Sequence, residues 1–280
     1  MRPVKKPLGP AIEIINPHIK QDRIRHALFD FDGTISLIRE GWPGVMIPMM
    51  VEILLQAPHH ESEEELHAVV TDYVERLTGK QTIYQMIQFC EEVGNRGGEP
   101  RSAQAYKRMY HERLMERIEG RLVALNSGQV PPEEMMVPGA RPMLEALRAR
   151  DVTCYLASGT DEPYVLDEAA ALGITPYFAG IYGALDDHKR FSKKMVIERI
   201  IAENHLSGSE FVSFGDGFVE IEDTKSVGGI AVGVASNEAT RSGVNEWKRQ
   251  RLIEAGADLI IADFRQHERL VAYLLDGRGL

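Results

Sequence analysis

Short apolar runs alternate with segments of helical periodicity along most of this chain, and this alternation constrains the fold more than any other feature. Each run is compact and is bounded by Gly, Asp or Ser, which is the pattern of a buried strand. Five runs are predicted as strands: 24–30, 152–158, 211–216, 229–235 and 258–263. The helices predicted in the same parts of the chain are 143–150, 161–173, 193–204 and 239–256. The alternation predicts an α/β fold in which helices cover both faces of a parallel sheet.

The stretch from about residue 37 to 136 breaks this alternation, because it has little β character and much helical period. Ser62 and Glu65 form a capping-box pattern before one helix. A long amphipathic helix is predicted over 104–128, where it ends at Asn-Ser-Gly. A short segment near the start, 11–17, is a candidate edge strand that would pair near the first strand. We therefore expect a helical cap at 37–136, inserted into a core made of 1–36 and 137–280.

Composition limits the possible partners. The chain has 280 residues, of which 44% are hydrophobic and 26% charged, as in ordinary soluble globular proteins. The net charge of −10 weighs against a nucleic-acid partner, although a local basic pocket can still bind a small anion. No apolar run approaches the roughly 18 residues of a membrane span, so no membrane partner is expected. The sequence carries no signal for an oligomeric state.

The cysteines and the N-terminal residues indicate the cellular compartment in which the protein is expected. Cys90 and Cys154 are the two cysteines, and neither lies in a CxxC or zinc pattern. We expect two buried free thiols in a reducing compartment, and hence a cytoplasmic location. The first ten residues are basic and rich in proline, without the apolar stretch of a secretory signal, and we expect a frayed tail there.

Two aspartates, Asp30 and Asp32, end the first predicted strand and precede a Gly-Thr turn in the stretch HALFDFDGTIS. In an extended chain, side chains two residues apart point to the same side, roughly 6–7 Å from each other. An EF-hand calcium loop is excluded, since Gly33 would fall at position four of the loop rather than six. Two interpretations remain open. One is a hairpin turn, and the other is a nucleophilic site where a hard cation such as Mg²⁺ neutralises the pair.

Further polar residues follow other predicted strands. Asp216 ends the third strand, and Glu220 comes four residues later in GDGFVE. Lys193 and Lys194 open the helix before that strand; paired lysines are usually solvated, but one could be drawn inward among the acids. The second strand ends in LASGT, which is either a plain helix N-cap or an arrangement of hydroxyl and N–H groups that holds an anion. The polar residues of LASGT are Ser158, Gly159 and Thr160.

Taken in order, DFDGT, LASGT, a lysine that opens the next helix, and GDGFVE resemble the four motifs of the haloacid dehalogenase-like (HAD) hydrolase superfamily. The resemblance covers about 24–36 and 137–263. It implies a Rossmann-like parallel-sheet core, and the helical insert resembles the C1-type cap of that superfamily.

The resemblance implies a role for each motif residue. Asp30 would be the nucleophile and Asp32 the acid/base, Ser158 would hold a phosphoryl oxygen, and Lys193, with Lys194 as the alternative, would supply positive charge. Many members carry a second aspartate where this chain has Glu220, which keeps the charge and could instead act through water or hold the lysine. The residues implied for Mg²⁺ are Asp30, Asp32 through its backbone carbonyl, Asp216 and Glu220.

The implied function is a Mg²⁺-dependent phosphatase that hydrolyses a small phosphorylated metabolite through an aspartyl-phosphate. Asp32 argues against a dehalogenase, because displacing halide needs no acid for the leaving group. A phosphomutase of the same superfamily and a non-catalytic module that binds a phosphorylated ligand remain as alternatives. The residues expected to contact substrate are Ser158, Gly159 and Thr160 from the core, and Arg39, Trp42, Lys80 and Gln81 from the cap. Three histidines that could bind a metal or take part in catalysis, His59, His60 and His188, are expected to be solvated instead.

Overall fold

The computed structural model describes residues 12–185, 187 and 190–277, so the expected N-terminal tail and His188 lie outside the described residues. Its described residues form one seven-stranded sheet with the order β1-β7-β6-β5-β2-β3-β4. Every neighbouring pair is parallel except β1 and β7. The strands are β1 (Ile12–Ile14), β2 (His26–Phe29), β3 (Thr153–Asp161), β4 (Phe178–Ala184), β5 (Phe211–Gly215), β6 (Ile230–Val234) and β7 (Leu259–Ile261). The five predicted strands and the parallel sheet are confirmed.

Two strands differ from expectation. The first segment is an edge strand, but β1 pairs with β7, where Ile12 lies opposite Ile261. The prediction that it pairs near the first strand is wrong, because β3 and β5 already flank β2 on its two sides. The edge strand β4 was not predicted. Most of its residues are only half-buried and two are glycines, so it lacks the compact apolar pattern of the other strands.

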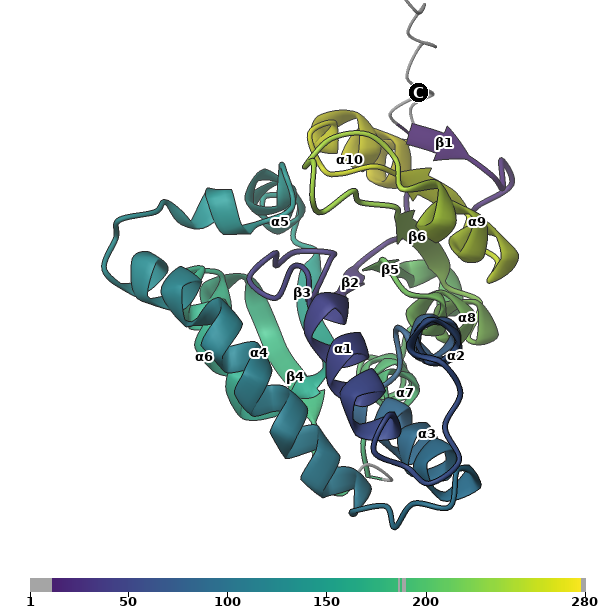
Figure 1. Ribbon diagram of the computed structural model, residues 1–280. Coiled ribbons are helices and arrows are strands. Elements are labelled where there is room, and N and C mark those ends of the chain that lie inside the picture. The colour runs from purple at the N-terminus through teal and green to yellow at the C-terminus, as the bar shows by residue number, and fades with distance from the viewer. Residues whose placement is uncertain (1–11, 186, 188–189, 278–280) are drawn as a thin grey trace, which may run out of the picture.

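Helices pack on both faces of the sheet (Figure 1). Ala27 and Phe29 of β2 pack in one apolar cluster with residues of α5 and α10, whereas Leu28, which points the other way, packs with Ile197 of α7. The core helices are α5 (Ala140–Arg148), α6 (Glu162–Ala171), α7 (Lys193–Glu203), α8 (Phe218–Ser226), α9 (Glu246–Glu254) and α10 (His267–Asp276). Short 3-10 turns lie at Pro132–Met135, Thr175–Tyr177 and Gly208–Glu210.

Three of these helices differ from the sequence analysis. Helices α8 and α10 were not predicted, and α8 contains acidic residues that resembled a loop. Helix α9 is shorter than the predicted 239–256, because Asn245 caps it by accepting a hydrogen bond from the backbone N–H of Lys248. Gly243, two residues earlier, has φ +77°, which also ends any helix that begins upstream.

The helical insert between β2 and β3 is confirmed. It consists of α1 (Pro43–Leu54), α2 (Glu63–Leu77), α3 (Thr82–Asn95) and α4 (Ala103–Asn126). The predicted capping box is present, since Ser62 accepts a hydrogen bond from the backbone N–H of Glu65 while the Glu65 carboxylate accepts one from that of Ser62. The division of the chain at residues 36 and 137 stays a prediction.

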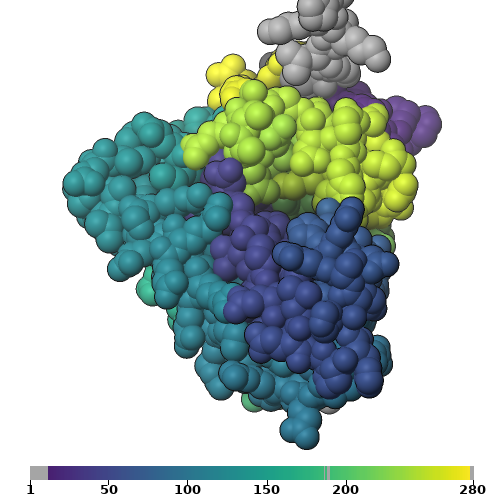
Figure 2. Space-filling model, in the orientation of Figure 1, coloured from purple at the N-terminus to yellow at the C-terminus, as the bar shows by residue number. Residues whose placement is uncertain are grey.

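The insert is joined to the core by two segments that lie side by side. The backbone N–H of Leu37 donates to the carbonyl of Met135 (2.8 Å), and that of Val137 donates to the carbonyl of Ile35 (2.9 Å). Figure 2 shows the blue helices of the insert in contact with the yellow-green part of the core. Part of this contact is the guanidinium of Arg251 in α9, which donates to the carbonyl of Glu75 in α2 (2.6 Å). The insert therefore packs against the core as well as being tethered to it.

Two smaller expectations concern thiols and membranes. Cys154 is a buried free thiol as expected, whereas Cys90 is also free but only half-buried. Among the described residues, no helix is long and apolar enough to cross a membrane.

The packing at the centre of the sheet can be tested by truncating one ring. Phe214 of β5 stacks on Phe29 of β2 with a centroid distance of 4.6 Å, and both rings are fully buried. Phe214→Ala is expected to lower the free energy of unfolding by about 4 kcal/mol, through lost apolar burial and the cavity left behind. Urea denaturation measures it. Val123→Ala, at an exposed position on α4, should change the free energy by less than about 0.5 kcal/mol. Equal effects of the two changes would contradict the assigned packing.

Candidate active site

Polar side chains from separate parts of the chain meet where the parallel strands end. Asp30 follows β2, Ser158 lies near the end of β3, and Asp216 follows β5. Because these three strands are adjacent and parallel, their carboxyl ends lie at one edge of the sheet. A cavity of about 100 Å³ opens at this edge, and residues of the helical insert complete its wall. The structure places Asp30, Ser158 and Asp216 around this one cavity.

The ammonium of Lys193 is buried in the site. It lies 2.7 Å from Oδ1 of Asp30 and 2.9 Å from Oε2 of Glu220, and only 5% of its side chain is exposed. Burial lowers the pKa of Lys193, but the charges of Asp30 and Glu220 outweigh burial, so the pKa lies above the ordinary lysine value. The alternative, Lys194, is 51% exposed and faces Glu198 on the surface of α7. Lys193 is therefore the lysine that α7 directs into the site.

Glu220 is held in place by its own helix. Its Oε1 accepts a hydrogen bond of 2.7 Å from the backbone N–H of Gly217, which caps the start of α8. A Cβ on residue 215 would lie 2.2 Å from Cγ of Glu220, so Gly215 leaves the space that the glutamate fills. Of the roles considered for Glu220, holding the lysine is the one that its contacts show.

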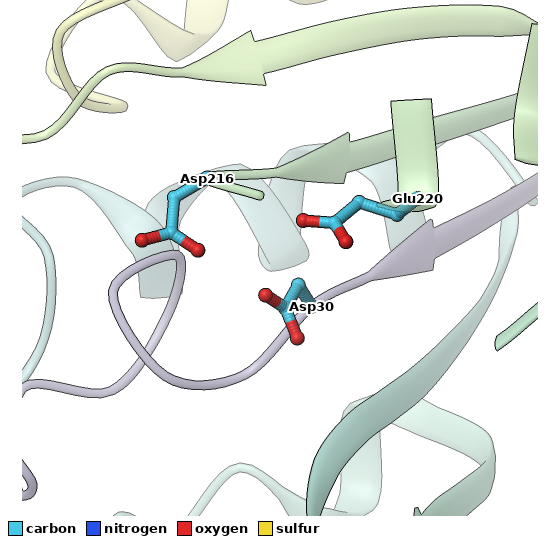
Figure 3. Close-up of side chains that lie close together, drawn as sticks. All are labelled: Asp30, Asp216 and Glu220. Atoms are coloured by element: carbon cyan, nitrogen blue, oxygen red, sulfur yellow. The ribbon is translucent and has the colours of Figure 1, made fainter. Parts of the chain in front are cut away.

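Three carboxylates converge beside this lysine and could hold a metal ion. One oxygen each of Asp30, Asp216 and Glu220 lie within 4.8 Å of one another (Figure 3). An all-oxygen, anionic donor set is what a hard cation such as Mg²⁺ requires, so these residues fit the implied metal. The side chain of Asp32 does not belong to this cluster, and ligation through its backbone carbonyl stays a prediction.

The carboxylate of Asp32 is held by the end of β3. Its Oδ2 accepts hydrogen bonds from Oγ1 of Thr160 (2.9 Å) and Oγ of Ser158 (3.3 Å). Its Oδ1 is buried and has no hydrogen-bond donor among the described residues. The strand runs on to Asp161 before α6 begins, so these hydroxyls lie at a strand end rather than at a helix start. One oxygen of Asp32 is thus fixed, and the other is left for a further partner.

Arg39 was expected to contact substrate from the cap, but its guanidinium is bound to Glu168 of α6. The Nη2–Oε1 distance is 2.6 Å, the Nε–Oε1 distance is 2.9 Å, and only 7% of Arg39 is exposed. Burial raises the pKa of Glu168 to about 7, although Arg39 opposes this. The Nε atom of Arg39 also lies 4.0 Å from Oδ1 of Asp32. Arg39 thus lies beside the aspartate pair, with its Nε and Nη2 groups donating to Glu168, and substrate binding by Arg39 stays a prediction.

The turn between α2 and α3 closes the other side of the cavity. A Cβ on Gly79 would lie 3.4 Å from Cα of Gly217, and one on Gly159 would lie 3.0 Å from the carbonyl oxygen of Lys80. Gln81 donates a hydrogen bond of 2.7 Å to the carbonyl of Phe191, just before α7. This turn therefore rests on the end of β3 and on the loops before α7 and α8.

The other residues predicted to contact substrate from the cap differ in position. Trp42 is half-buried at the start of α1 and lines the cavity together with Lys80, whereas Gln81 is buried in the contact with the core. His59 and His60 are exposed, as expected. The binding roles of Trp42, Lys80, Gly159 and Thr160 stay predictions.

Several site residues were missed by the sequence analysis. Lys248 of α9 is buried and binds Asp216 and Glu238, each at 2.7 Å. Tyr110 of α4 is buried and lines the cavity. No spacing in the sequence marks these residues, since each lies within a helical segment or a loop of ordinary composition. Only the packing of α9 on the sheet and of α4 on α6 shows their position.

The chain was compared with known families and proteins. A sequence model of the haloacid dehalogenase-like hydrolases matches residues 24–228. No curated protein sequence matches the chain.

Solved structures with the same fold are numerous, at low sequence identity. A predicted phosphoglycolate phosphatase from Haemophilus somnus is 16% identical, with a TM-score of 0.58 over 90% of this chain and 100% of that one. A putative β-phosphoglucomutase from Thermotoga maritima is 18% identical, with a TM-score of 0.54 over 90% and 100%. CbbY from Rhodobacter sphaeroides, in complex with xylulose-(1,5)bisphosphate, is 17% identical, with a TM-score of 0.53 over 86% and 95%.

The assignment of the buried lysine can be tested by stability. Lys193→Met leaves Asp30 and Glu220 facing each other without a counter-charge, so in chelator-treated protein it should lower the free energy of unfolding by about 3 kcal/mol. Urea denaturation at pH 8 measures it. Lys194→Met, at the exposed neighbouring position, should change the free energy by less than about 0.5 kcal/mol. A larger effect at position 194 than at 193 would reverse the assignment.

Proposed function

This chain belongs to the haloacid dehalogenase-like hydrolases, and from this we propose that it is a Mg²⁺-dependent phosphatase that hydrolyses a small phosphorylated metabolite through an aspartyl-phosphate. One observation carries the proposal. The buried Asp30 lies against Lys193 and among converging acidic groups, while Asp32, two residues later, is held separately by hydroxyls of β3. The two aspartates thus have different surroundings, as a nucleophile and an acid/base require.

The first step makes the covalent intermediate. A carboxylate oxygen of Asp30 attacks phosphorus, and the bond from phosphorus to the leaving oxygen breaks. Asp32 donates a proton to that oxygen, so the alcohol leaves neutral. Lys193, which contacts Asp30, and the hydroxyl of Ser158, which lines the same cavity, would stabilise negative charge on the transferred phosphoryl group.

The second step returns the enzyme to its starting state. Asp32, now ionised, takes a proton from water while the water oxygen attacks phosphorus. The bond between Asp30 and phosphorus breaks, and orthophosphate leaves. The hydrogen bond from Thr160 keeps one oxygen of Asp32 fixed through both steps and leaves the other for the proton. Mg²⁺, which Asp30, Asp216 and Glu220 would hold, supplies the positive charge that lets one anion attack another.

The helical insert bounds the space for the leaving group. Trp42, Tyr110, Lys80 and Gln85 line this part of the cavity, and they combine aromatic faces with polar ends. The cavity has a volume of about 100 Å³. This supports a small, polar, phosphorylated metabolite as the substrate. The sugar bisphosphate bound to CbbY belongs to the same chemical class.

The nucleophile assignment can be tested by one isosteric change. Asp30→Asn keeps the shape of the side chain but removes the attacking charge, so phosphate release with Mg²⁺ should fall by at least about 1,000-fold. Orthophosphate release from a panel of phosphorylated metabolites, at saturating Mg²⁺, measures it. Asp72→Asn, at an exposed position on the insert, is the matched control and should leave the rate unchanged. Wild-type rates in Asp30→Asn would refute the assignment.

The same panel separates this function from the alternatives. A phosphatase releases orthophosphate in step with substrate loss, whereas a mutase would convert substrate to an isomer without net release. Tight binding of a phosphorylated ligand without turnover would indicate a binding module instead. We expect stoichiometric orthophosphate release that stops when Mg²⁺ is chelated.

The role of the insert can be tested at its contact with the core. Gln81→Ala removes the hydrogen bond to the carbonyl of Phe191, and the loss of one buried hydrogen bond should lower kcat/KM by about tenfold. The Mg²⁺ concentration at half-maximal activity should not change. Gln88→Ala, which removes a pair with Glu92 within the same helix, is the control and should leave kcat/KM as it is. Unchanged kinetics in Gln81→Ala would show that this contact does not hold the site closed.

A further inference from the structure

Lys248, which lies outside the four motifs, contacts a cluster of polar residues. Its ammonium lies 2.7 Å from Oδ2 of Asp216, 2.7 Å from Oε1 of Glu238 and 3.3 Å from Oγ of Ser236. Only 8% of the residue is exposed. The cluster joins three separate elements, because Lys248 lies in α9, Asp216 follows β5, and Ser236 and Glu238 follow β6.

The same cluster reaches the loop after β2, residues 30–36, which carries both aspartates. The hydroxyl of Ser236 donates a hydrogen bond of 2.6 Å to the carbonyl of Gly33. Gly33 has φ +76°, and a Cβ there would lie 2.2 Å from Oδ2 of Asp216. The carboxylate of Asp216 is therefore enclosed between the loop on one side and Lys248 on the other.

We propose that Lys248 is a positioning residue of the Mg²⁺ site, which fixes the carboxylate of Asp216 and ties it to the loop that carries Asp30. This inference rests on the proposed function. A hydrogen bond to Oδ2 sets the rotation of the carboxylate and hence the direction of its other oxygen. Figure 3 shows Asp216 with an oxygen directed toward Asp30 and Glu220. Without Lys248, that group would turn freely beside two other carboxylates that repel it.

The charges of the site agree with a single divalent ion. Among the groups that pair with Lys193 and Lys248, four carboxylates (Asp30, Asp216, Glu220 and Glu238) face two ammonium groups, which leaves a net charge of −2 for this set. One Mg²⁺ balances this charge. Lys248 therefore lowers the negative charge to the amount that one ion neutralises, while it orders a ligand for that ion.

The direction in which Lys248→Met changes Mg²⁺ affinity distinguishes a positioning role from a role in charge balance alone. Lys248→Met makes the site more negative, so electrostatics alone would tighten Mg²⁺ binding. If Lys248 orders Asp216, binding weakens instead, by about tenfold, as is typical when a group that orients a metal ligand is lost. Isothermal titration of metal-free protein with Mg²⁺ measures this without reference to activity. Raising the Mg²⁺ concentration by the same factor should then restore most of the phosphatase rate of Lys248→Met.

Two further variants complete the design. Lys225→Met is the matched control, because Lys225 binds the buried Asp258 at 2.8 Å outside the site, so this change should alter stability but leave Mg²⁺ affinity unchanged. Ser236→Ala keeps the lysine and removes the link to Gly33, and it should weaken Mg²⁺ binding severalfold. Ser236→Ala also replaces Lys248→Met as the test if Lys248→Met does not fold. Near-UV circular dichroism shows whether each variant folds.

The outcomes distinguish this inference from the proposed function. Weaker Mg²⁺ binding in Lys248→Met, or in Ser236→Ala where Lys248→Met does not fold, supports this inference if Lys225→Met leaves the affinity unchanged. Equal or tighter binding in a folded Lys248→Met, or in Ser236→Ala where it replaces that variant, overturns it, while leaving the proposed function intact if the wild type binds Mg²⁺ and releases phosphate. A wild-type protein that binds no Mg²⁺ overturns both.

Discussion

The ion pairs of Lys193 with Asp30 and Glu220 impose the strongest physical constraint on this molecule. Three charged groups are almost fully withdrawn from water, which costs several kcal/mol for each ion unless the partners are held in close contact. The contacts require the ends of β2 and β5 and the starts of α7 and α8 to lie close together. The parallel order of the sheet meets that requirement, because it puts the ends of neighbouring strands at one edge. The apolar packing of Phe29 and Phe214 beneath the site keeps those ends in register.

The sequence predicted the parts of the site that depend on local order. Asp30 and Asp32 share a short motif at a strand end, and Asp216 with Glu220 forms another, so the alternation of strands and helices suffices to bring them together. The choice between Lys193 and Lys194 needed the structure, since only the rotation of α7 on the sheet decides which of two adjacent residues points inward. The family match and the fold agree with the predicted architecture.

Residues whose role depends on packing between distant elements were not predictable in this way. Lys248 and Asp216 are 32 residues apart, and Arg39 and Glu168 are 129 apart. In each pair, one partner lies on a helix where a charged residue is ordinarily solvated. Helix α8 was missed because its acidic residues resemble a loop, and β4 because an edge strand needs less apolar surface than a central one. The expected partner of β1 was wrong because sequence order does not determine position in a sheet.

The two segments that join the insert to the core also bear on how the cavity opens. A single tether would let the insert rotate about any backbone bond, but here the outgoing and returning chains are hydrogen-bonded to each other on both sides of the Ser36–Met136 pair. A two-stranded ribbon bends across its flat face far more easily than it twists or shears. This joint would limit any motion of the insert to a swing about one axis, so that the turn after α2 would return to the same contacts with the core.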